Sequence, residues 1–383
     1  MQVVLISKYF VPDRSVDAVS VSHLISALIA RDPHIEIHIV TTNHNYKNEP
    51  EKVKAATSLE TLFKVHRVNS LYGGNNKYLL LIGAVTDGLR LVLKARRLQI
   101  PNVISLTNPP LITFWCAMLL RRRNWLYWTF DLYPDALKAS HILSGKSLFY
   151  RLIESFVYNA PPSTLISLGK KQYAYLTDKY EKEVPWICLP CGILPENSQT
   201  NKEPPDWFVQ GKYYVGYLGN IGKAHSKDFI IEFVKNFPAL EGYTLVLAVY
   251  GEHRLEIENF VKKSNFDNVV LVGKVERQHL HLIDIHLVSL LEEWTHISVP
   301  SKAVSAVCVG SALIFYGSRH SDTWDMFKEC SFFVDRTTDL ASLLSSILPR
   351  EVEEKKSKAR KIAMHLIHQQ ESAYDQILAS LKM

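Results

Sequence analysis

Two short segments in the second half of the chain combine glycine, lysine and hydroxyl residues in an order suited to binding phosphate. The first is Gly219-Asn220-Ile221-Gly222-Lys223-Ala224-His225-Ser226-Lys227, which follows an apolar strand and precedes a helical pattern. Glycine lets the backbone approach a ligand, and a helix N-terminus attracts phosphate oxygens. Lys223, His225 and Lys227 would add donors. The spacing is not G-x-G-x-x-G, which disfavours a nicotinamide dinucleotide, and a glycine turn without a ligand is the alternative.

The second segment is Pro300-Ser301-Lys302, which also follows an apolar strand and opens a helical pattern running to Gly310. A lysine at the start of a helix can neutralise a diphosphate. The alternative is an N-capping serine beside a solvated lysine. Glu292 lies ten positions before Lys302, between the preceding strand and this motif.

Both segments belong to alternating strand and helix patterns. Continuous apolar or β-branched runs, typical of strands covered on both faces, predict strands at Met1–Ser7, Ile35–Thr42, Leu62–Val68, Val103–Thr107, Trp125–Phe130, Thr164–Ser167 and Trp186–Leu189, and, after a break, at Tyr213–Leu218, Thr244–Val249, Val269–Val272, Ile285–Leu290, Ala312–Phe315 and Phe332–Val334. Helical patterns lie between them, for example at Ser20–Ala30, Leu80–Arg96 and Ser226–Phe237. This alternation predicts doubly wound parallel sheets, which bind ligands beyond the carboxyl ends of their strands.

A polar, proline-bearing stretch, Pro195–Pro205, divides the two series and is typical of a domain boundary. We therefore expect an α/β protein of two Rossmann-like domains facing a central cleft, with residues 1–194 in the first and 195–361 in the second. The amphipathic segment 362–383 is expected to be a helix that packs back on the first domain.

Composition limits the class of protein. With 383 residues, 47% of them hydrophobic, the chain is long enough for two globular domains and is not a disordered or low-complexity sequence. A net charge of +6 suits an anionic ligand or a membrane surface and is too small to indicate nucleic acid. Five scattered cysteines fit a reduced, cytoplasmic protein. Tyr78–Leu93 and Leu111–Leu120 are too polar or too short to span a bilayer; each is expected to be a buried helix, with peripheral membrane contact as the alternative.

The ordered set of motifs resembles glycosyltransferase family 4, the retaining enzymes of GT-B fold, and within it the bacterial polysaccharide and colanic-acid type that carries Pro-Ser-Lys. The segments that carry the resemblance are Tyr9-Phe10-Val11-Pro12-Asp13, Thr107-Asn108-Pro109-Pro110, Asp131-Leu132-Tyr133-Pro134, Gly219-Asn220-Ile221-Gly222, Gly251-Glu252, Gly273-Lys274-Val275 and Val299-Pro300-Ser301-Lys302, with Gly310 after them.

The resemblance implies a hexosyltransferase that moves a sugar from a nucleotide sugar, most often UDP-linked, to a glycan or lipid-linked acceptor in exopolysaccharide or surface-glycan synthesis. It places Asn220, Gly222, His225 and Ser301 at the diphosphate and the backbone around Val275 at the base. Lys302 and Asp131 are the expected catalytic residues, Lys302 at the leaving diphosphate and Asp131 across the cleft. Retention would need no protein nucleophile, and positioning and charge neutralisation would supply the catalysis.

This chain departs from the family at the two positions where many relatives have glutamates, which are Ile297 and Ser305 here. Glu292 or Glu293 is a candidate substitute. A catalytically degenerate binding subunit is therefore one alternative function, and a sugar-nucleotide epimerase of the same fold is another. No Asp-x-Asp triplet occurs in the sequence, so we expect no required metal and no cofactor beyond the sugar-nucleotide substrate.

Overall fold

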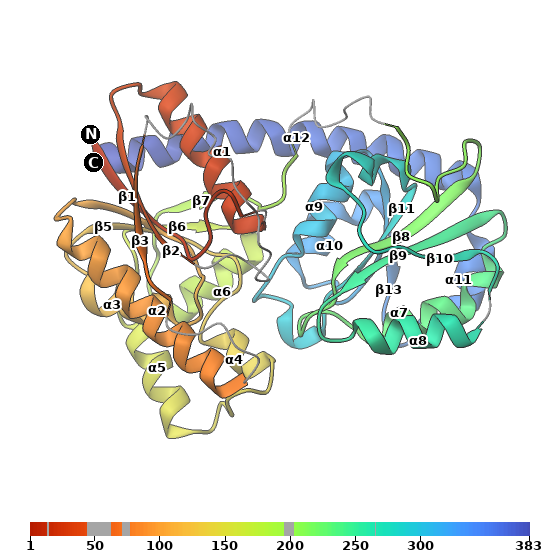
Figure 1. Ribbon diagram of the computed structural model, residues 1–383, viewed down its shortest axis with the longest axis horizontal. Helices are drawn as coiled ribbons and strands as arrows, with labels where there is room; N and C mark the ends of the chain where they lie inside the picture. The colour runs from red at the N-terminus through yellow and green to blue at the C-terminus, as the bar shows by residue number, and fades with distance from the viewer. Residues whose placement is uncertain (14, 44–62, 71–76, 195–202, 265) are drawn as a thin grey trace. The chain divides into compact units, whose positions relative to one another are not determined.

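The computed structural model describes residues 1–13, 15–43, 63–70, 77–194, 203–264 and 266–383, and of residues 77–81 it describes the backbone alone. The described chain forms two compact units (Figure 1). The first comprises Met1–Cys191 and Gln369–Met383, and the second comprises Gly192–His368. The sequence predicts the domain boundary after residue 194, and the second unit begins at Gly192. Most of the predicted linker, residues 195–202, lies outside the described residues.

The first unit contains a parallel sheet of seven strands in the order β3-β2-β1-β4-β5-β6-β7. The strands are β1 (Gln2–Ile6), β2 (Glu36–Thr42), β3 (Phe63–Val68), β4 (Asn102–Ser105), β5 (Asn124–Trp128), β6 (Thr164–Ser167) and β7 (Trp186–Cys188). Residues 103–105 of β4 and all of β6 are buried, as expected for strands covered by helices on both faces. The strand order reverses beside β1, which makes the sheet doubly wound.

The helices of the first unit are α1 (Val16–Arg31), α2 (Lys77–Arg97), α3 (Ile112–Leu119), α4 (Asp135–Ala139), α5 (Leu148–Tyr158) and α6 (Lys170–Tyr180). The side chain of Ser15 caps α1 by accepting a hydrogen bond from the N–H of Ala18. Residues 111–120, one of the two stretches considered for a membrane surface, form the mostly buried helix α3 and its flanks. No helix in the described ranges is both long and apolar enough to cross a bilayer.

The second unit contains a parallel sheet of six strands in the order β10-β9-β8-β11-β12-β13. The strands are β8 (Tyr213–Asn220), β9 (Tyr243–Tyr250), β10 (Val269–Leu271), β11 (Ile285–Ser289), β12 (Ala312–Tyr316) and β13 (Ser331–Val334). Here the order reverses between β8 and β11, and ligands of such sheets bind at the carboxyl ends of the strands beside the reversal. The predicted pair of doubly wound parallel sheets is confirmed.

The α-helices of the second unit are α7 (Lys227–Asn236), α8 (Arg254–Ser264), α9 (Ser301–Cys308), α10 (Asp322–Phe327), α11 (Leu340–Ser346) and the first part of α12 (Pro349–Lys382). Short 3-10 turns are η2 (Phe237–Ala239), η3 (Arg277–Leu282), η4 (Glu292–Trp294) and η5 (Lys328–Cys330). One core cluster joins α7 to β8 through residues such as Phe229, Phe233 and Tyr217. That packing fixes where the polar ends of these elements lie.

The helix predicted at the C-terminus is α12, and it contributes to both units. Val352, in its first half, belongs to the core of the second unit. In its last turns Ile377 and Leu381 are buried in the first unit. Arg31 of α1 pairs with Glu371 at 2.7 Å and with Asp375 at 2.6 Å, which anchors this end of the helix.

Candidate functional site

The carboxyl end of β8 and the first turn of α9 bring Lys302, Tyr217 and Asn220 together. Nζ of Lys302 donates to Oη of Tyr217 at 2.6 Å and to the backbone carbonyl of Asn220 at 3.0 Å. The Tyr217 hydroxyl donates to the same carbonyl at 3.1 Å, and Nζ lies 4.1 Å from the centre of the Tyr217 ring. Every one of these partners is neutral.

Burial lowers the pKa of Lys302 to about 7. The charged form loses hydration, and neutral oxygens and an aromatic ring replace only part of it. An ammonium group in this state gains more from an anion than a solvated lysine would, because the surrounding low dielectric strengthens the attraction. The alternative interpretation of Lys302 as a solvated lysine is therefore wrong. That Lys302 neutralises a diphosphate stays a prediction.

Glycines allow the chain to pass close to Asn220. Gly219 has a φ of 137° and Gly251 a φ of 100°, a region that side-chain-bearing residues rarely adopt. A Cβ on Gly251 would overlap Oδ1 of Asn220, and one on Gly222 would lie 3.2 Å from Nδ2 of the same side chain. A Cβ on Gly219 would point toward Nζ of Lys302 at 3.9 Å. These glycines therefore position Asn220 and leave space beside the ammonium group.

His225 lies in the same region and is held in its neutral form. Its Nδ1 lies 2.6 Å from the backbone carbonyl of Ser289, at the end of β11, so that nitrogen carries the proton. Burial and the nearby charge of Lys302 lower the pKa of His225 to about 3. Nε2 is consequently an acceptor, and it becomes a donor to phosphate only if an arriving anion raises the pKa of the ring.

Two donors expected from the sequence are already engaged by the protein. Lys227 forms an ion pair with Glu256 of α8, with N–O distances of 2.7 and 2.8 Å. The hydroxyl of Ser226 accepts from the N–H of Phe229 and so occupies one N–H group of the first turn of α7. The suggestion that Lys227 points at a ligand is not supported by this geometry.

The N-terminus of helix α9 is not occupied by a capping side chain. Ser301 is the first residue of α9, Pro300 is its N-cap, and no side chain caps the helix. The alternative that Ser301 is the cap is therefore wrong. Ser301 packs closely against the preceding chain, because a Cβ on Gly192 would lie 2.7 Å from its carbonyl oxygen. The motif thus starts the helix and directs Lys302 toward the end of β8.

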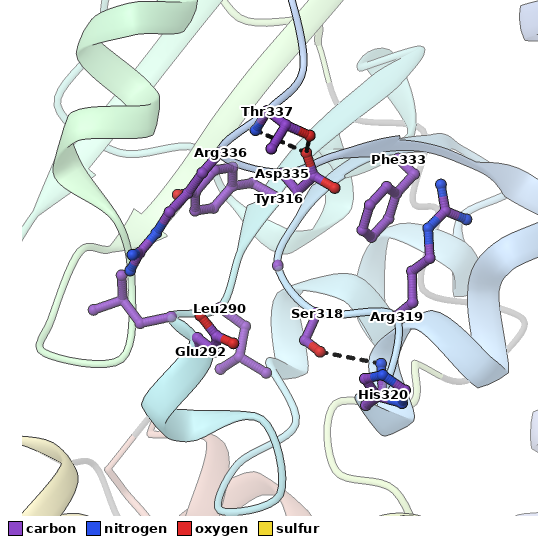
Figure 2. Close-up of a pocket in the computed structure, with 12 residues that line it drawn as sticks. Leu290, Glu292, Tyr316, Ser318, Arg319, His320, Phe333, Asp335, Arg336 and Thr337 are labelled. Atoms are coloured by element: carbon purple, nitrogen blue, oxygen red, sulfur yellow. Dashed lines mark hydrogen bonds between the residues drawn. The ribbon is translucent and has the colours of Figure 1, made fainter.

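Glu292 lines a pocket of about 320 Å³ at the carboxyl ends of β12 and β13 (Figure 2). The pocket is lined by Leu290, Leu291, Glu292, Tyr316, Gly317, Ser318, Arg319, His320, Phe333, Asp335, Arg336 and Thr337. Arg319 lies 3.9 Å from the centre of the Phe333 ring. A hydrogen bond to Tyr316, and then Glu292 and Glu293, raise the pKa of Arg336. The N–H of Leu291 donates to the carbonyl of Ala224, so this segment is tied to the glycine loop.

Val275, the residue expected at the base, packs against the small cluster of Tyr214, Val246 and Ile283. Sequence reasoning missed three neighbours of the site. Tyr217 lies within β8 and Tyr250 is the last residue of β9, and a Cβ on Gly219 would lie 3.7 Å from Oη of Tyr250. Arg277 lies close enough to Tyr250 to interact with its hydroxyl electrostatically. In the sequence Tyr217 lies within a predicted strand and Tyr250 directly follows another, whereas no pattern singles out Arg277, which begins η3.

Asp131 lies in the first unit, shortly after β5, in an acidic group with Asp13 and Asp17. Asp17 is 8% exposed and accepts a hydrogen bond from Nδ2 of Asn108. Burial raises the pKa of Asp17 to about 6, against the effect of Asn108, and the charges of Asp131 and Asp13 add to the rise. The structure thus gathers three carboxylates, from the segment after β1, the first turn of α1 and the segment after β5.

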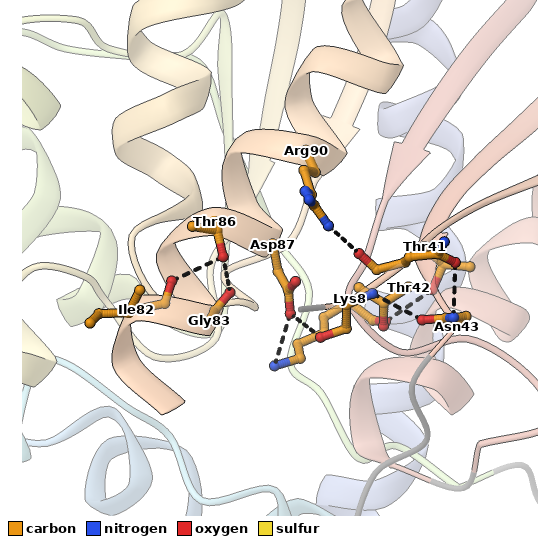
Figure 3. A network of polar contacts seen from close by, with 11 residues as sticks. Lys8, Thr41, Thr42, Asn43, Ile82, Gly83, Thr86, Asp87 and Arg90 are labelled. Atoms are coloured by element: carbon orange, nitrogen blue, oxygen red, sulfur yellow. Dashed lines mark hydrogen bonds and ion pairs between the residues drawn. The ribbon is translucent and has the colours of Figure 1, made fainter. Parts of the chain in front are cut away.

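A second partly buried lysine in the first unit, Lys8, has a different environment (Figure 3). It follows β1, and its Nζ lies 3.9 Å from Oδ2 of Asp87 on α2, which also accepts from Ser70. Burial lowers the pKa of Lys8, and Asp87 opposes the change. Asp87 lies within the stretch 78–93 and is buried, which favours the buried-helix interpretation of that stretch for the side chains described. Lys302, by contrast, has only neutral hydrogen-bond partners among the contacts given above.

In the described part of the chain, no three histidine, cysteine, aspartate or glutamate side chains lie together in a way that could hold a metal ion. His286 is buried and neutral: its Nε2 lies 3.1 Å from the carbonyl of Leu280, and burial lowers its pKa to about 4. The five cysteines are free thiols.

Solved structures share this architecture along the whole chain. Sucrose-phosphate synthase from Thermosynechococcus elongatus aligns over 99% of both chains with a TM-score of 0.70 at 16% identity. WaaG, a glycosyltransferase involved in lipopolysaccharide biosynthesis, covers 98% of this chain and 99% of its own, with a TM-score of 0.66 at 14% identity. Anabaena Alr3699/HepE, solved with UDP and glucose, covers 99% and 100%, with a TM-score of 0.66 at 12% identity.

These neighbours are GT-B glycosyltransferases, and the two parallel-sheet α/β units of this chain have the GT-B fold. No protein-family model and no curated protein matches the sequence. At these identities the comparison establishes the fold alone.

Proposed function

We propose that this chain is a glycosyltransferase that uses a nucleotide sugar, with UDP as the carrier and the second unit as the donor-binding unit. The observation that carries the proposal is the Lys302 ammonium group, which has only neutral hydrogen-bond partners at the sheet edge where doubly wound folds bind their ligands. A diphosphate would supply the missing counter-charge. The solved complex of HepE with UDP and glucose supports the choice of nucleotide.

Lys302 would act on the leaving group. As the bond between the sugar and the diphosphate breaks, negative charge grows on the phosphate oxygens, and an ammonium already in place stabilises it without reorganisation. In the proposed retaining reaction the acceptor attacks from the same face, and the departing phosphate takes its proton. Loss of one such contact costs about 3 kcal/mol, or about a hundredfold in rate.

Other residues of the second unit would make the remaining contacts with the donor. Asn220, fixed by Gly251, and the backbone at Gly222 would contact the diphosphate beside Lys302. Ser301 would add the open first turn of α9. His225 would donate through Nε2 once the anion has raised its pKa. Val275 would contact the base, and Glu292 the sugar, in place of the absent glutamate pair.

The acceptor side of the proposal rests on the first unit and on Asp131. We propose a glycan or a lipid-linked saccharide as acceptor, in exopolysaccharide or surface-glycan synthesis, and membership of the Pro-Ser-Lys type of glycosyltransferase family 4. We also propose that the protein acts in the cytoplasm. The sequence has no Asp-x-Asp triplet to clamp a metal diphosphate, so the proposed reaction is metal-independent and uses no cofactor.

Titration calorimetry with UDP and a panel of UDP-sugars tests the donor site. The wild-type protein should bind UDP, and Lys302→Ala should weaken binding about a hundredfold. Lys227→Ala is the matched control, because its ammonium group is paired with Glu256, and it should leave the affinity within about twofold. If UDP binds equally to wild type and Lys302→Ala, or to neither, the donor site is wrongly placed.

Transfer itself is tested by incubating radiolabelled UDP-sugars with membrane lipid extract. A labelled product whose anomeric configuration by NMR matches that of the donor supports a retaining transferase. Nucleotide binding without product would indicate the catalytically degenerate alternative. A change in the sugar of the unreacted nucleotide would indicate an epimerase.

A further inference from the structure

Helix α5 in the first unit presents a stripe of large apolar side chains to solvent. Leu148 is 74% exposed, Phe149 61%, Leu152 51% and Phe156 54%. At about 100° per residue these four positions lie within about 100° of the helix surface. An exposed apolar surface of this kind is uncommon unless it meets a partner or a lipid surface.

The stripe is not the side of α5 that forms the core. Tyr150, Ile153 and Val157 are buried and face the unit. Phe114 of α3 contacts the stripe at Phe156, where the two ring centres lie 5.7 Å apart. Ile142, just before α5, and Met118 of α3 are also exposed, which extends the apolar character beyond one helix.

The exposed ionic side chains of α5 and of the chain that precedes it are basic. Across residues 111–160 the exposed ionic side chains are all basic: Arg121, Arg122, Lys138, Lys146 and Arg151. Each acidic residue of that range is shielded: Asp135 is buried, Asp131 is partly buried, and Glu154 is paired with Lys179 at 2.5 Å. Lys138 lies against the segment that precedes α5, because a Cβ on Gly145 would be 3.1 Å from its side chain.

We infer that α5 and its flanking lysines and arginine form a surface that docks on a lipid bilayer containing anionic lipids. The apolar stripe would enter the boundary between headgroups and acyl chains, and Lys146 and Arg151 would meet the headgroups. A second copy of this chain fits less well, since a symmetric contact through the stripe would bring two basic surfaces together. The inference goes beyond the proposed function, because it depends on α5 and not on the donor site.

Flotation with vesicles tests the surface on the full chain. Wild type should float with vesicles of phosphatidylcholine mixed with phosphatidylglycerol, and much less with phosphatidylcholine alone. Leu148→Ser/Leu152→Ser should reduce the bound fraction at least tenfold. The matched control is Leu255→Ser/Leu348→Ser, which removes two equally exposed leucines of the second unit and should leave flotation unchanged.

Lys146→Glu/Arg151→Glu tests the charges. Each basic residue near an anionic surface contributes about fivefold to binding, so loss of both positive charges alone should lower it about thirtyfold, and the added glutamates should lower it further. Added salt should weaken the wild type in the same direction. Circular dichroism of each variant checks the fold. UDP affinity is a separate readout, so failure of the donor site leaves this test intact. Equal flotation of wild type and both variants, or no flotation of wild type, overturns the inference; so does a lipid-free dimer that Leu148→Ser/Leu152→Ser converts to monomer.

Discussion

Lys302 lowers the stability of the folded protein, and it is also the residue proposed to bind the donor diphosphate. Its ammonium group loses hydration in the folded protein, and the lowered pKa of about 7 expresses that cost. A buried base whose pKa falls from 10.5 makes the folded protein less stable at every pH where the unfolded chain is protonated. The protein retains the lysine despite this cost, which is typical of a binding residue.

We predict that Lys302→Met raises the free energy of unfolding and abolishes tight UDP binding. One pKa unit corresponds to about 1.4 kcal/mol, and water reaches part of the side chain, so we expect a gain of about 2 kcal/mol at pH 7. The gain should shrink as pH rises from 7 toward 10.5, because the proton that the unfolded chain must release on folding is then held less tightly, and above 10.5 the lysine is neutral in both states. Urea unfolding at pH 7 and at pH 9.5 measures it, and a loss of stability in the variant would contradict the argument.

The binding of UDP to wild type should itself depend on pH. A diphosphate raises the pKa of Lys302, so affinity is full below pH 7 and falls as pH rises above it, by at most tenfold per unit. Protons are taken up on binding near neutral pH. Calorimetry in two buffers of different ionisation enthalpy detects the uptake, and an affinity that stays constant between pH 6 and 9 would contradict it.

Gly251→Ala should damage the site through Asn220. Its φ of 100° strains any alanine, and the new Cβ would overlap Oδ1 of Asn220. Gly242→Ala is the matched control, because its φ is 80° but nothing lies within 4 Å of the added Cβ. Both variants should lose about 1 kcal/mol of stability, whereas only Gly251→Ala should weaken UDP binding, by about tenfold or more. Equal UDP affinities would show that Asn220 does not depend on Gly251.

At the scale of elements, the start of α1 shows how packing can overrule a local preference. Asp17 lies in the first turn, where the helix dipole favours a carboxylate. Packing buries it beside Asn108 and near Asp131, and burial raises its pKa to about 6. Desolvation of the charged form therefore outweighs the dipole and the hydrogen bond.

We predict that Asp17→Asn stabilises the protein above pH 6. A carboxyl group with a raised pKa costs stability as pH rises from about 4 through 6, and the amide removes that cost while still accepting a hydrogen bond from Asn108. The gain should be near zero at pH 4 and about 2 kcal/mol at pH 8. Thermal unfolding at both pH values measures it. The exposed Asp178→Asn is the control, and an equal gain at both pH values would contradict the prediction.

At the scale of the whole molecule, α12 joins two separate cores. Ile377 is fully buried in the first unit, and Val352 belongs to the core of the second. One helix therefore allows each unit to be weakened independently.

Ile377→Ala should lower the unfolding temperature of the first unit, and Val352→Ala that of the second, each through a cavity worth about 2–3 kcal/mol. Calorimetry should resolve two transitions, and UDP should raise only the one that Val352→Ala lowers. If both variants shift a single transition equally, the units unfold as one, and the assignment of UDP to the second unit needs a different test.

Most strands, and some of the helix starts and candidate site residues, can be predicted from the sequence. Continuous apolar runs set the strands, because strands of a covered parallel sheet bury both faces, and Ser226 marks the start of α7 through its capping side chain. The helix predicted at 20–30 begins earlier, at Val16, where Ser15 is the cap. The sequence also singled out Lys302 and Asn220, from glycine and lysine placed just after apolar strands. Their role in binding a donor stays a prediction.

Tertiary structure decided the electrostatics and the surfaces. The sequence does not show that Lys227 is engaged by Glu256, that Tyr217 holds the ammonium of Lys302, or that Asp17 joins Asp131. It also placed the membrane alternative on residues 78–93 and 111–120, while the exposed apolar stripe belongs to α5. The reason is physical: hydrophobic periodicity records how much apolar surface an element has, whereas desolvation and exposure depend on which distant residues pack against it.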